Sequence, residues 1–215
     1  MLIPFEIIKH ILLSQNIEVH GALHIGAHEC EELDFYHRMG ISSNNIVWID
    51  AIPSKVDKAV ERGIPNVYNA VVTDKDDEEV IFHISNNGQS SSVLELGTHL
   101  QEHPHIFYVE EIAQKSVTID TFFERKQLDA SKYDFWNFDI QGAELMALKG
   151  SIQSIQHAKA IYLEVNEKEL YKECGLIGEI DAFLSTFHFK RVYTNMTPHG
   201  WGDALYILDR QPLLN

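Results

Sequence analysis

Short apolar runs alternate with helix-like segments along this chain, and that alternation constrains the fold more than any other feature. No internal repeat or low-complexity tract interrupts the order. Such alternation is typical of a doubly wound α/β fold with a mostly parallel sheet. The predicted strands of this sheet are residues 19–25, 46–51, 67–72, 135–140, 160–165, 189–195 and 204–208.

The strand pattern departs from simple alternation in two places. Residues 79–84 alternate like a half-exposed antiparallel strand, and the acidic turn 74–77 precedes them, which predicts a small β-hairpin insertion with residues 67–72. The last two predicted strands form an antiparallel C-terminal pair. The predicted helices are residues 31–39, 53–63, 116–125, 142–155 and 177–187, the fourth with Leu145, Met146, Leu148 and Ile152 facing inward.

The length suits one domain, which we expect to span residues 1–215. Residues 1–16 have apolar side chains at helical spacing, interrupted by Glu6, Lys9 and His10. This segment is too short and too charged to cross a bilayer, and it lacks the basic start of a signal peptide. We expect it to form a helix on the flank of the domain, with a partner-binding or membrane-surface helix as the alternative.

Acidic residues outnumber basic ones by 32 to 17, which gives a formal net charge of -15 at pH 7. A field of this sign repels phosphate backbones, so we expect no nucleic-acid partner. Cys30 and Cys174 form neither a metal-type pair nor a disulfide framework. That usage indicates a reducing compartment, and we expect a cytoplasmic protein. The oligomeric state is left open.

Ligands of doubly wound sheets bind at the carboxyl ends of the strands, so the residues that follow each strand are the candidate site. Gly26 follows the first strand in a tight turn, where it would let the backbone approach a ligand. Cys30 stands where a dinucleotide fingerprint would have a further glycine. Asp50 ends the second strand, where nucleotide folds place a carboxylate that accepts both ribose hydroxyls; the alternative is a cap for the next helix.

Acidic residues also end the later strands. Asp139 follows a strongly apolar run, and Glu164 ends the next one, so adjacent strands would bring two carboxylates together. Two such groups repel unless a cation lies between them, which predicts a site for a sulfonium, a metal ion or a protonated base. The plainer alternatives are a helix cap for Asp139, a favourable helix-terminus charge for Glu144 and a surface salt bridge for Glu164.

Several short motifs follow one another in a consistent order. They are residues 23–28 (LHIGAH), 69–74 (NAVVTD), 90–93 (SSSV), 117–120 (VTID), 138–144 (FDIQGAE), 148–150 (LKG) and 162–165 (YLEV). In this order and spacing they resemble the FkbM methyltransferases, from about residue 19 to about residue 208. Each motif is weak alone, whereas the set together is specific.

The resemblance implies a class I methyltransferase fold with a seven-stranded sheet and S-adenosyl-L-methionine as the cofactor. It implies O-methylation of a small molecule or glycan, with a sugar hydroxyl in a glycan or natural product as the leading acceptor and nitrogen acceptors behind it. The cofactor-binding residues that follow are Gly26, His28, Asp50, Ala51, Asn69, Ala70, Ser91 and Asp139.

Four positions depart from the family pattern. His24 stands where an acid usually precedes the first glycine, and Cys30 replaces a later glycine. Asn137 replaces the usual Lys before the strand-tip Asp, and Gln141 replaces the usual Glu after it. These departures concern how the methionine end of the cofactor is held. They support one alternative function, a non-catalytic methyltransferase-like binding module.

Methyl transfer to an alcohol requires that the hydroxyl proton be removed as the new bond forms. We predict Asp139 as the base, His199 as a second candidate base and Glu164 as support. Asp139 and Glu164 would instead be ligands if a divalent metal lowers the pKa of the hydroxyl. The loop histidines 99, 103 and 105 show no metal-ligand spacing, so we expect them to be solvated.

An NAD-dependent oxidoreductase is a further alternative, because Gly26 and Asp50 would serve a dinucleotide as well. The missing glycines disfavour it. Asp139 and Glu164 also have no clear use beside a dinucleotide pyrophosphate. The sequence therefore favours a methyltransferase over an oxidoreductase.

Overall fold

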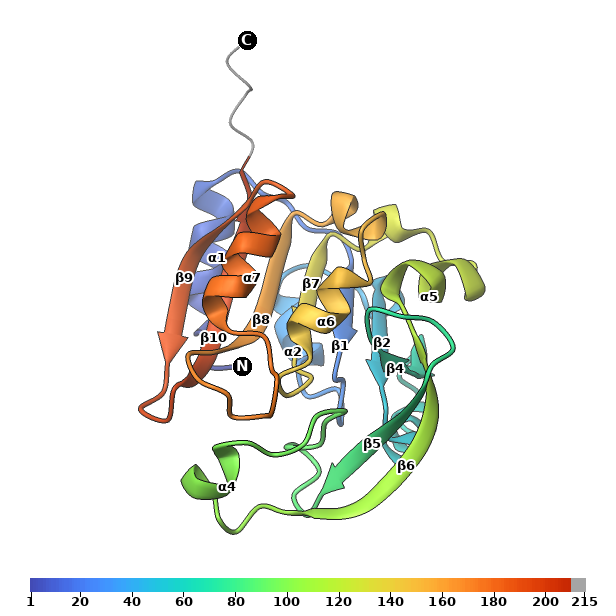
Figure 1. The fold of residues 1–215 in the computed structure, drawn as a ribbon. Helices are drawn as coiled ribbons and strands as arrows, with labels where there is room; N and C mark the ends of the chain where they lie inside the picture. Colours follow the sequence, from blue (N-terminus) through green and yellow to red (C-terminus); the bar gives the residue numbers. More distant parts are fainter. Residues whose placement is uncertain (210–215) are drawn as a thin grey trace.

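The computed structural model describes residues 1–209, so the last six residues of the predicted domain, 210–215, lie outside the described part. Its main sheet has seven strands in the order β3-β2-β1-β7-β8-β10-β9 (Figure 1). Within it β10 runs antiparallel to both of its neighbours, β8 and β9, and the other pairs are parallel. The strands are β1 Ala22–Ile25, β2 Ile46–Asp50, β3 Val67–Asn69, β7 Phe135–Phe138, β8 Ala160–Asn166, β9 Phe189–Met196 and β10 Trp201–Leu208.

This architecture confirms the predicted class I methyltransferase-like sheet with its antiparallel C-terminal pair. Side chains of the buried strands alternate between two cores, as the pleat of a strand requires. Leu23 and Val47 belong to one core, and Ala22 and Trp48 belong to the other. The sheet is therefore covered on both faces, which explains why its central strands read as continuous apolar runs.

Helices supply the second layer of each core. Figure 1 shows α6 and α7 in front of the main sheet and α1 and α2 behind it. The helices of the first core are α5 Ile119–Arg125, α6 Glu144–Lys149 and α7 Ile177–Ser185. Those of the second core are α1 Phe5–Ser14, α2 Leu33–Arg38 and α3 Pro53–Glu61. The helix α1 lies within the predicted segment 1–16 and buries Ile8 and Leu12.

A second, three-stranded sheet has the order β4-β6-β5. Its strands are β4 Val71–Val72, β5 Glu79–Ser85 and β6 Tyr108–Val117. The predicted strand 67–72 is divided between the two sheets, and β5 pairs antiparallel with β6 instead of with residues 67–72. The β-hairpin insertion is present, but its second strand was missed because β6 is mostly exposed and shows little apolar alternation.

The bounds of α6 also differ from the prediction. The helix predicted over residues 142–155 ends at Lys149, where Gly150 is the C-cap, and Ile152 is exposed instead of inward. A side-chain carbon at Gly150 would lie 2.4 Å from the Thr73 carbonyl oxygen, so close packing fixes the helix end. The remaining elements are the short helix α4 His99–Glu102 and the 3₁₀ turns η1 Ser43–Asn45, η2 Ala130–Lys132 and η3 Ser154–His157.

Candidate active site

The centre of the main sheet contains a topological switch point. β1 and β7 are neighbours, but β2 and β3 follow on one side and β8 follows on the other. Loops that leave such a pair of strands diverge and open a crevice at the carboxyl edge. A cavity of about 520 Å³ lies there, lined by loops after β1, β2, β7 and β8 and by part of the segment 86–107. Its volume falls in the range of small-molecule sites.

The structure brings most of the predicted site residues together around this cavity. Asn69 is exposed and not among the lining residues, and its Nδ2 donates to the Asp50 carbonyl oxygen at 3.0 Å. His199 also lies outside the lining, and its Nδ1 is 2.9 Å from Glu102 Oε2. The predicted residues that do line the cavity are Gly26, His28, Asp50, Ala51, Ala70, Ser91, Asp139 and Glu164.

The half of the cavity beside β2 and β3, which we call the nucleotide half, is organised by Asp50. One carboxylate oxygen accepts the backbone N–H of His28 at 2.7 Å, and the other accepts that of Ile52 at 2.8 Å. The helix α3 begins at Pro53 with Ile52 as its N-cap, so Asp50 is not the helix cap. Burial raises the pKa of Asp50, against the two backbone N–H groups, which lower it. Each oxygen retains a lone pair for a ligand hydroxyl.

Gly26 has a structural role in addition to the one expected beside a ligand. Its backbone φ is +89°, and a side-chain carbon there would lie 1.8 Å from the Asp139 carbonyl oxygen. The close approach that requires glycine is therefore between the loops after β1 and β7, inside the protein itself. A larger residue at this position would therefore clash with the Asp139 backbone, in addition to any effect on a ligand.

The opposite half, which we call the acidic half, is formed by Asp139, Glu164 and Asp203. β7 and β8 are parallel neighbours with Phe138 opposite Leu163, so the carboxylates that follow lie at adjacent strand ends, as predicted. A neutral side-chain amide joins two of these carboxylates.

Gln141 supplies that amide. Its Nε2 donates to Asp139 Oδ1 and to Glu164 Oε2, both at 2.9 Å. Its Oε1 accepts the hydroxyl of Tyr171 at 2.7 Å. Gln141 has a φ of +55°, a left-handed conformation that is costly for a residue other than glycine. The turn after β7 thus holds one side chain against three partners.

Asp203 completes the acidic half and was missed by sequence reasoning. It was assigned to the loop before the last strand, but β10 begins at Trp201 and places Asp203 directly opposite Glu164. Tyr162 and the backbone N–H of Leu2 both donate to Asp203 Oδ2. The available signal was Trp201, an apolar residue just before the apolar run 204–208, but Gly200 and Gly202 on either side of it favoured a loop.

The burial of Glu144 was not predicted, because its position in the sequence favours an exposed charge at a helix terminus. The side chain is fully buried, and its Oε1 accepts the backbone N–H groups of Ile140 and Gly142 at 3.0 and 3.3 Å. Its Oε2 has no hydrogen-bond partner among residues 1–209, and burial raises the pKa of Glu144 to about 8. The N-cap of α6 is Ala143, so Asp139 does not cap this helix.

Desolvation dominates the electrostatics of the acidic half. Burial raises the pKa of Glu164 well above its usual value, and the charges of Asp139 and Glu144 raise it further. Desolvation by the surrounding protein raises the pKa of Asp139, although the hydrogen bond from Gln141 lowers it. The Asp139 side chain is nevertheless open to the cavity. Carboxyl groups with raised pKa values are suited to accept protons near neutral pH.

The geometry does not supply the ligand set of a metal ion. Within residues 1–209, no three His, Cys, Asp or Glu side chains are arranged to hold one. Asp139 and Glu164, the predicted metal ligands, are instead joined through Gln141.

Two of the departures from the family pattern are neighbours. His24 and Asn137 lie opposite each other in the β1–β7 register. His24 Nδ1 is 2.9 Å from the Tyr36 hydroxyl, which also accepts the Asn137 amide at 3.1 Å. Burial lowers the pKa of His24 to about 4, so this network is uncharged at neutral pH. None of the three side chains lines the cavity.

The loop histidines are not simply solvated. His99, His103 and His105 all line the cavity, and only 5% of His99 is exposed. The ring centroid of His103 lies 4.9 Å from that of His99 and 5.0 Å from that of His199. This segment therefore forms one wall of the site.

A family model described as the methyltransferase FkbM domain matches residues 24–193. The chain belongs to the FkbM methyltransferase family. Its cofactor is accordingly S-adenosyl-L-methionine. The cavity fits such a group, because Asp50 is held toward it with free lone pairs and apolar side chains of Ile49, Ala70 and Val71 stand beside it.

Solved structures resemble the chain more distantly. A magnesium protoporphyrin IX methyltransferase from Synechocystis, solved with the cofactor bound, is 10% identical with a TM-score of 0.46 over 94% of this chain and 77% of that one. A methyltransferase from Aquifex aeolicus is 12% identical, with a TM-score of 0.43 over 96% and 99%. A putative sarcosine dimethylglycine methyltransferase from Galdieria sulphuraria is 13% identical, with a TM-score of 0.48 over 94% and 84%. No curated protein matches the sequence.

Helices of membrane-spanning length and hydrophobicity are absent from residues 1–209. The longest helix, α1, has ten residues.

Proposed function

We propose that this FkbM family member is an O-methyltransferase that acts on a sugar hydroxyl of a glycan or natural product. The observation that carries the proposal is the carboxylate of Asp139, which opens onto the cavity while Gln141 holds one of its oxygens. A base in this position can take the proton of a hydroxyl that lies in the acidic half.

The nucleotide half is proposed to bind the cofactor. Asp50 accepts the ribose hydroxyls, and the loop of Gly26 and His28 surrounds the part of the cofactor next to them. Ala51, Ala70 and Ser91 contribute the surrounding wall. Asn69 acts indirectly, through its hydrogen bond to the Asp50 backbone.

S-adenosyl-L-methionine supplies a methyl group on a sulfonium, which needs no further activation. The protein orients the acceptor hydroxyl, and Asp139 Oδ2 accepts its proton as the oxygen–carbon bond forms and the carbon–sulfur bond breaks. Glu164 supports Asp139 through their common donor, Gln141. His199 is the second candidate base, although it is held by Glu102 outside the cavity lining and would have to move.

The two alternatives are weaker. A non-catalytic module is favoured by the uncharged His24 and Asn137, but these side chains lie outside the cavity lining. An NAD-dependent oxidoreductase is disfavoured by the match to a methyltransferase family. A divalent metal would need a ligand set that Asp139 and Glu164 do not complete among residues 1–209.

Calorimetry with S-adenosyl-L-methionine, S-adenosylhomocysteine and NAD tests the cofactor, because a ligand that binds the native state stabilises it. Release of S-adenosylhomocysteine with methyl glycosides as acceptors tests the reaction, and mass spectrometry of the product locates the new methyl group. Binding of NAD alone would contradict the methyltransferase proposal. Cofactor binding without any methyl transfer would favour the binding module.

We further propose that residues 1–215 form one cytoplasmic domain that does not bind nucleic acid. The net charge of -15 supports the last point, because it repels phosphate groups. A single cooperative unfolding transition and no retention on a nucleic-acid column are the expected results.

A further inference from the structure

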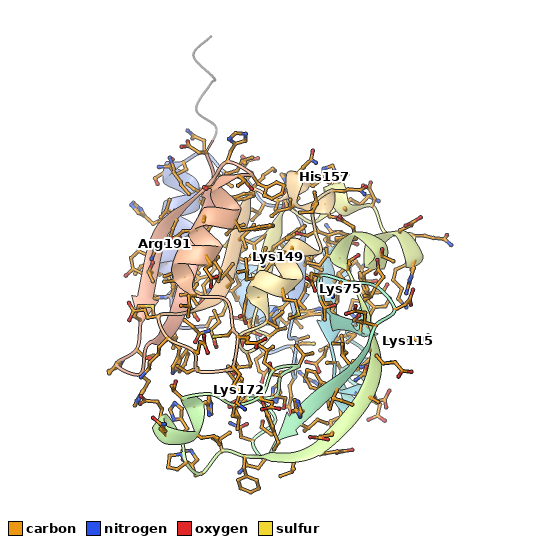
Figure 2. All side chains as sticks on the ribbon, in the orientation of Figure 1. Lys75, Lys115, Lys149, His157, Lys172 and Arg191 are labelled. Atoms are coloured by element: carbon orange, nitrogen blue, oxygen red, sulfur yellow. The ribbon has the colours of Figure 1, made fainter. Side chains whose placement is uncertain are left out.

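The cavity carries charged side chains of one sign. Within residues 1–209, no Lys or Arg is among the residues that line it. The basic side chains labelled in Figure 2 belong to other segments of the molecule. The acidic lining residues are Glu31, Glu32, Asp50, Asp139, Glu164 and Asp203. Against these carboxylates stands the N-terminal ammonium of Met1, which also lines the cavity and whose charge lowers the pKa of Asp139.

These carboxylates differ in how many of their oxygens already accept a hydrogen bond from the protein. Both oxygens of Asp50 accept backbone N–H groups, and both oxygens of Glu31 have partners, at 2.8 and 3.0 Å. Asp139, Glu164 and Asp203 each have one oxygen engaged, and the other has no partner among residues 1–209. The acidic half therefore holds three lining carboxylates that each have an unsatisfied oxygen.

Glu164 and Asp203 are the closest pair by topology. They are register partners across β8 and β10, and they are only 7% and 6% exposed. Like charges in a desolvated site repel, and the repulsion is relieved by a cation placed between them. The free oxygens of this pair are suited to a ligand ammonium group, which has three N–H donors.

His99 gives an independent indication of a ligand in the same cavity. The side chain lines the cavity and is 5% exposed, yet its Nδ1 has no hydrogen-bond partner among residues 1–209. Burial lowers the pKa of His99, so the ring is neutral at neutral pH and adds no positive charge. A buried polar atom without a partner is costly, and rotation of the ring toward the cavity would let a ligand hydroxyl satisfy it.

We propose that the acceptor is an amino sugar, whose ammonium group lies between Glu164 and Asp203 while a neighbouring hydroxyl faces Asp139. The inference rests on the proposed O-methyltransferase function and names its substrate class. Acceptors that carry a carboxylate or phosphate are disfavoured, because acidic groups outnumber cationic ones along the cavity.

The same arrangement directs the methyl group to oxygen. An amine held by two carboxylates stays protonated, and an ammonium nitrogen has no lone pair with which to attack. The hydroxyl loses its proton to Asp139, the oxygen–carbon bond forms, and the carbon–sulfur bond of the cofactor breaks to leave a neutral thioether. The ammonium group is unchanged by the reaction.

The test uses the full chain saturated with S-adenosylhomocysteine and a matched set of probes. The set contains methyl glycosides of glucosamine, N-acetylglucosamine, glucose and glucuronic acid, which differ mainly in charge. We expect the glucosaminide to bind at least tenfold more tightly than the N-acetylglucosaminide, and the glucuronide to bind most weakly. Calorimetry in two buffers of different ionisation enthalpy should show proton release for the amine alone, because Glu164 gives up its proton when the ammonium binds.

A variant of Asp203 tests whether the preference for the amine arises between Glu164 and Asp203. Asp203→Asn preserves shape and should remove most of the preference for the amine. Asp57→Asn makes the same charge change at an exposed position on α3 and should leave the preference intact. A normal Kd for S-adenosylhomocysteine in Asp203→Asn shows that the variant is folded.

Several outcomes would overturn the inference. Equal or absent binding of the glucosaminide and the N-acetylglucosaminide contradicts it, as does a preference that survives Asp203→Asn. Competition between the amine and S-adenosylhomocysteine would show that the acidic half holds the amino group of the cofactor instead. If S-adenosylhomocysteine itself does not bind, the proposed function fails first, which separates the two failures.

Discussion

The two halves of the cavity hold their carboxylates in different ways. In the nucleotide half, backbone N–H groups occupy both oxygens of Asp50. In the acidic half, Asp139 and Glu164 share the amide of one side chain, Gln141. Main-chain donors are part of the fold, whereas a side-chain amide can be exchanged without rebuilding it. Binding of the cofactor and proton transfer should therefore be separable by substitution, except where the halves are joined.

The largest effect is expected at Gly26, which joins the halves through its contact with the Asp139 backbone. Gly26→Ala should lower the free energy of unfolding by ~3 kcal/mol or more, because it adds a severe clash to an unfavourable φ. Gly40 is the matched control, since its φ is +86° and a side-chain carbon there meets nothing within 4 Å. Gly40→Ala should cost about 1 kcal/mol. Equal losses in urea denaturation would show that the loops are not in contact.

The next effect concerns the acidic half alone. Asp139→Asn keeps the shape and removes the base, so turnover should fall by ~10²-fold or more. The Kd for S-adenosylhomocysteine and the Tm should remain nearly unchanged. Turnover at the wild-type rate would exclude Asp139 as the base, and His199→Gln would be the following test.

The third effect concerns the nucleotide half alone. Asp50→Ala should weaken binding of S-adenosylhomocysteine by ~1.5–3 kcal/mol, the range for hydrogen bonds to a charged group. Asp57→Ala, at an exposed position on α3, is the control for general charge effects. Unchanged affinity in the folded Asp50 variant, measured by calorimetry, would place the ribose elsewhere.

The smallest effect is a change in pH dependence. Gln141→Glu removes two donors that lower the pKa values of Asp139 and Glu164 and adds a charge that raises them. The acidic limb of the pH–rate profile should move upward by ~1 unit. Gln156→Glu, the same change at an exposed site, should leave the profile in place.

The pH dependence of the free energy of unfolding gives a second test of Gln141→Glu, and this test needs no acceptor. Folded-state pKa values above the unfolded ones mean that the folded protein binds more protons. That stabilisation is complete below the unfolded pKa and is lost as the pH rises through the folded value. For Glu144 this window runs from 4.5 to about 8. Gln141→Glu should make the loss across it steeper, and an unchanged slope would contradict the assigned role of Gln141.

Much of the fold was predictable because buried parallel strands and amphipathic helices leave strong local patterns. Asp139 and Glu164 were placed at adjacent strand ends because the order of the motifs implied the sheet. The strand β6 was not predictable, since its mostly exposed side chains lack a clear period.

Less of the site was predictable, because its decisive contacts join segments far apart in the sequence. Gln141 lies 23 positions from Glu164 and 30 from Tyr171, and no local pattern predicts that one amide would contact both. Predicting that Asp203 belongs to the site required knowing that β10 begins at Trp201. The glycine at position 26 was noticed, but the carbonyl that requires it belongs to another loop.

The segment 86–107, which forms one wall of the cavity, begins and ends at the same place, because Ser85 pairs with Tyr108 at the end of the β5–β6 hairpin that this segment connects. The entropy of closing a loop on such fixed ends depends only weakly on its length. Insertions, deletions or exchanges between relatives can therefore reshape this wall while the main sheet keeps its strand order. Evolution, or a designer who grafts a different segment onto the same hairpin, could alter the choice of acceptor while Asp50 and the loop of Gly26 stay in place.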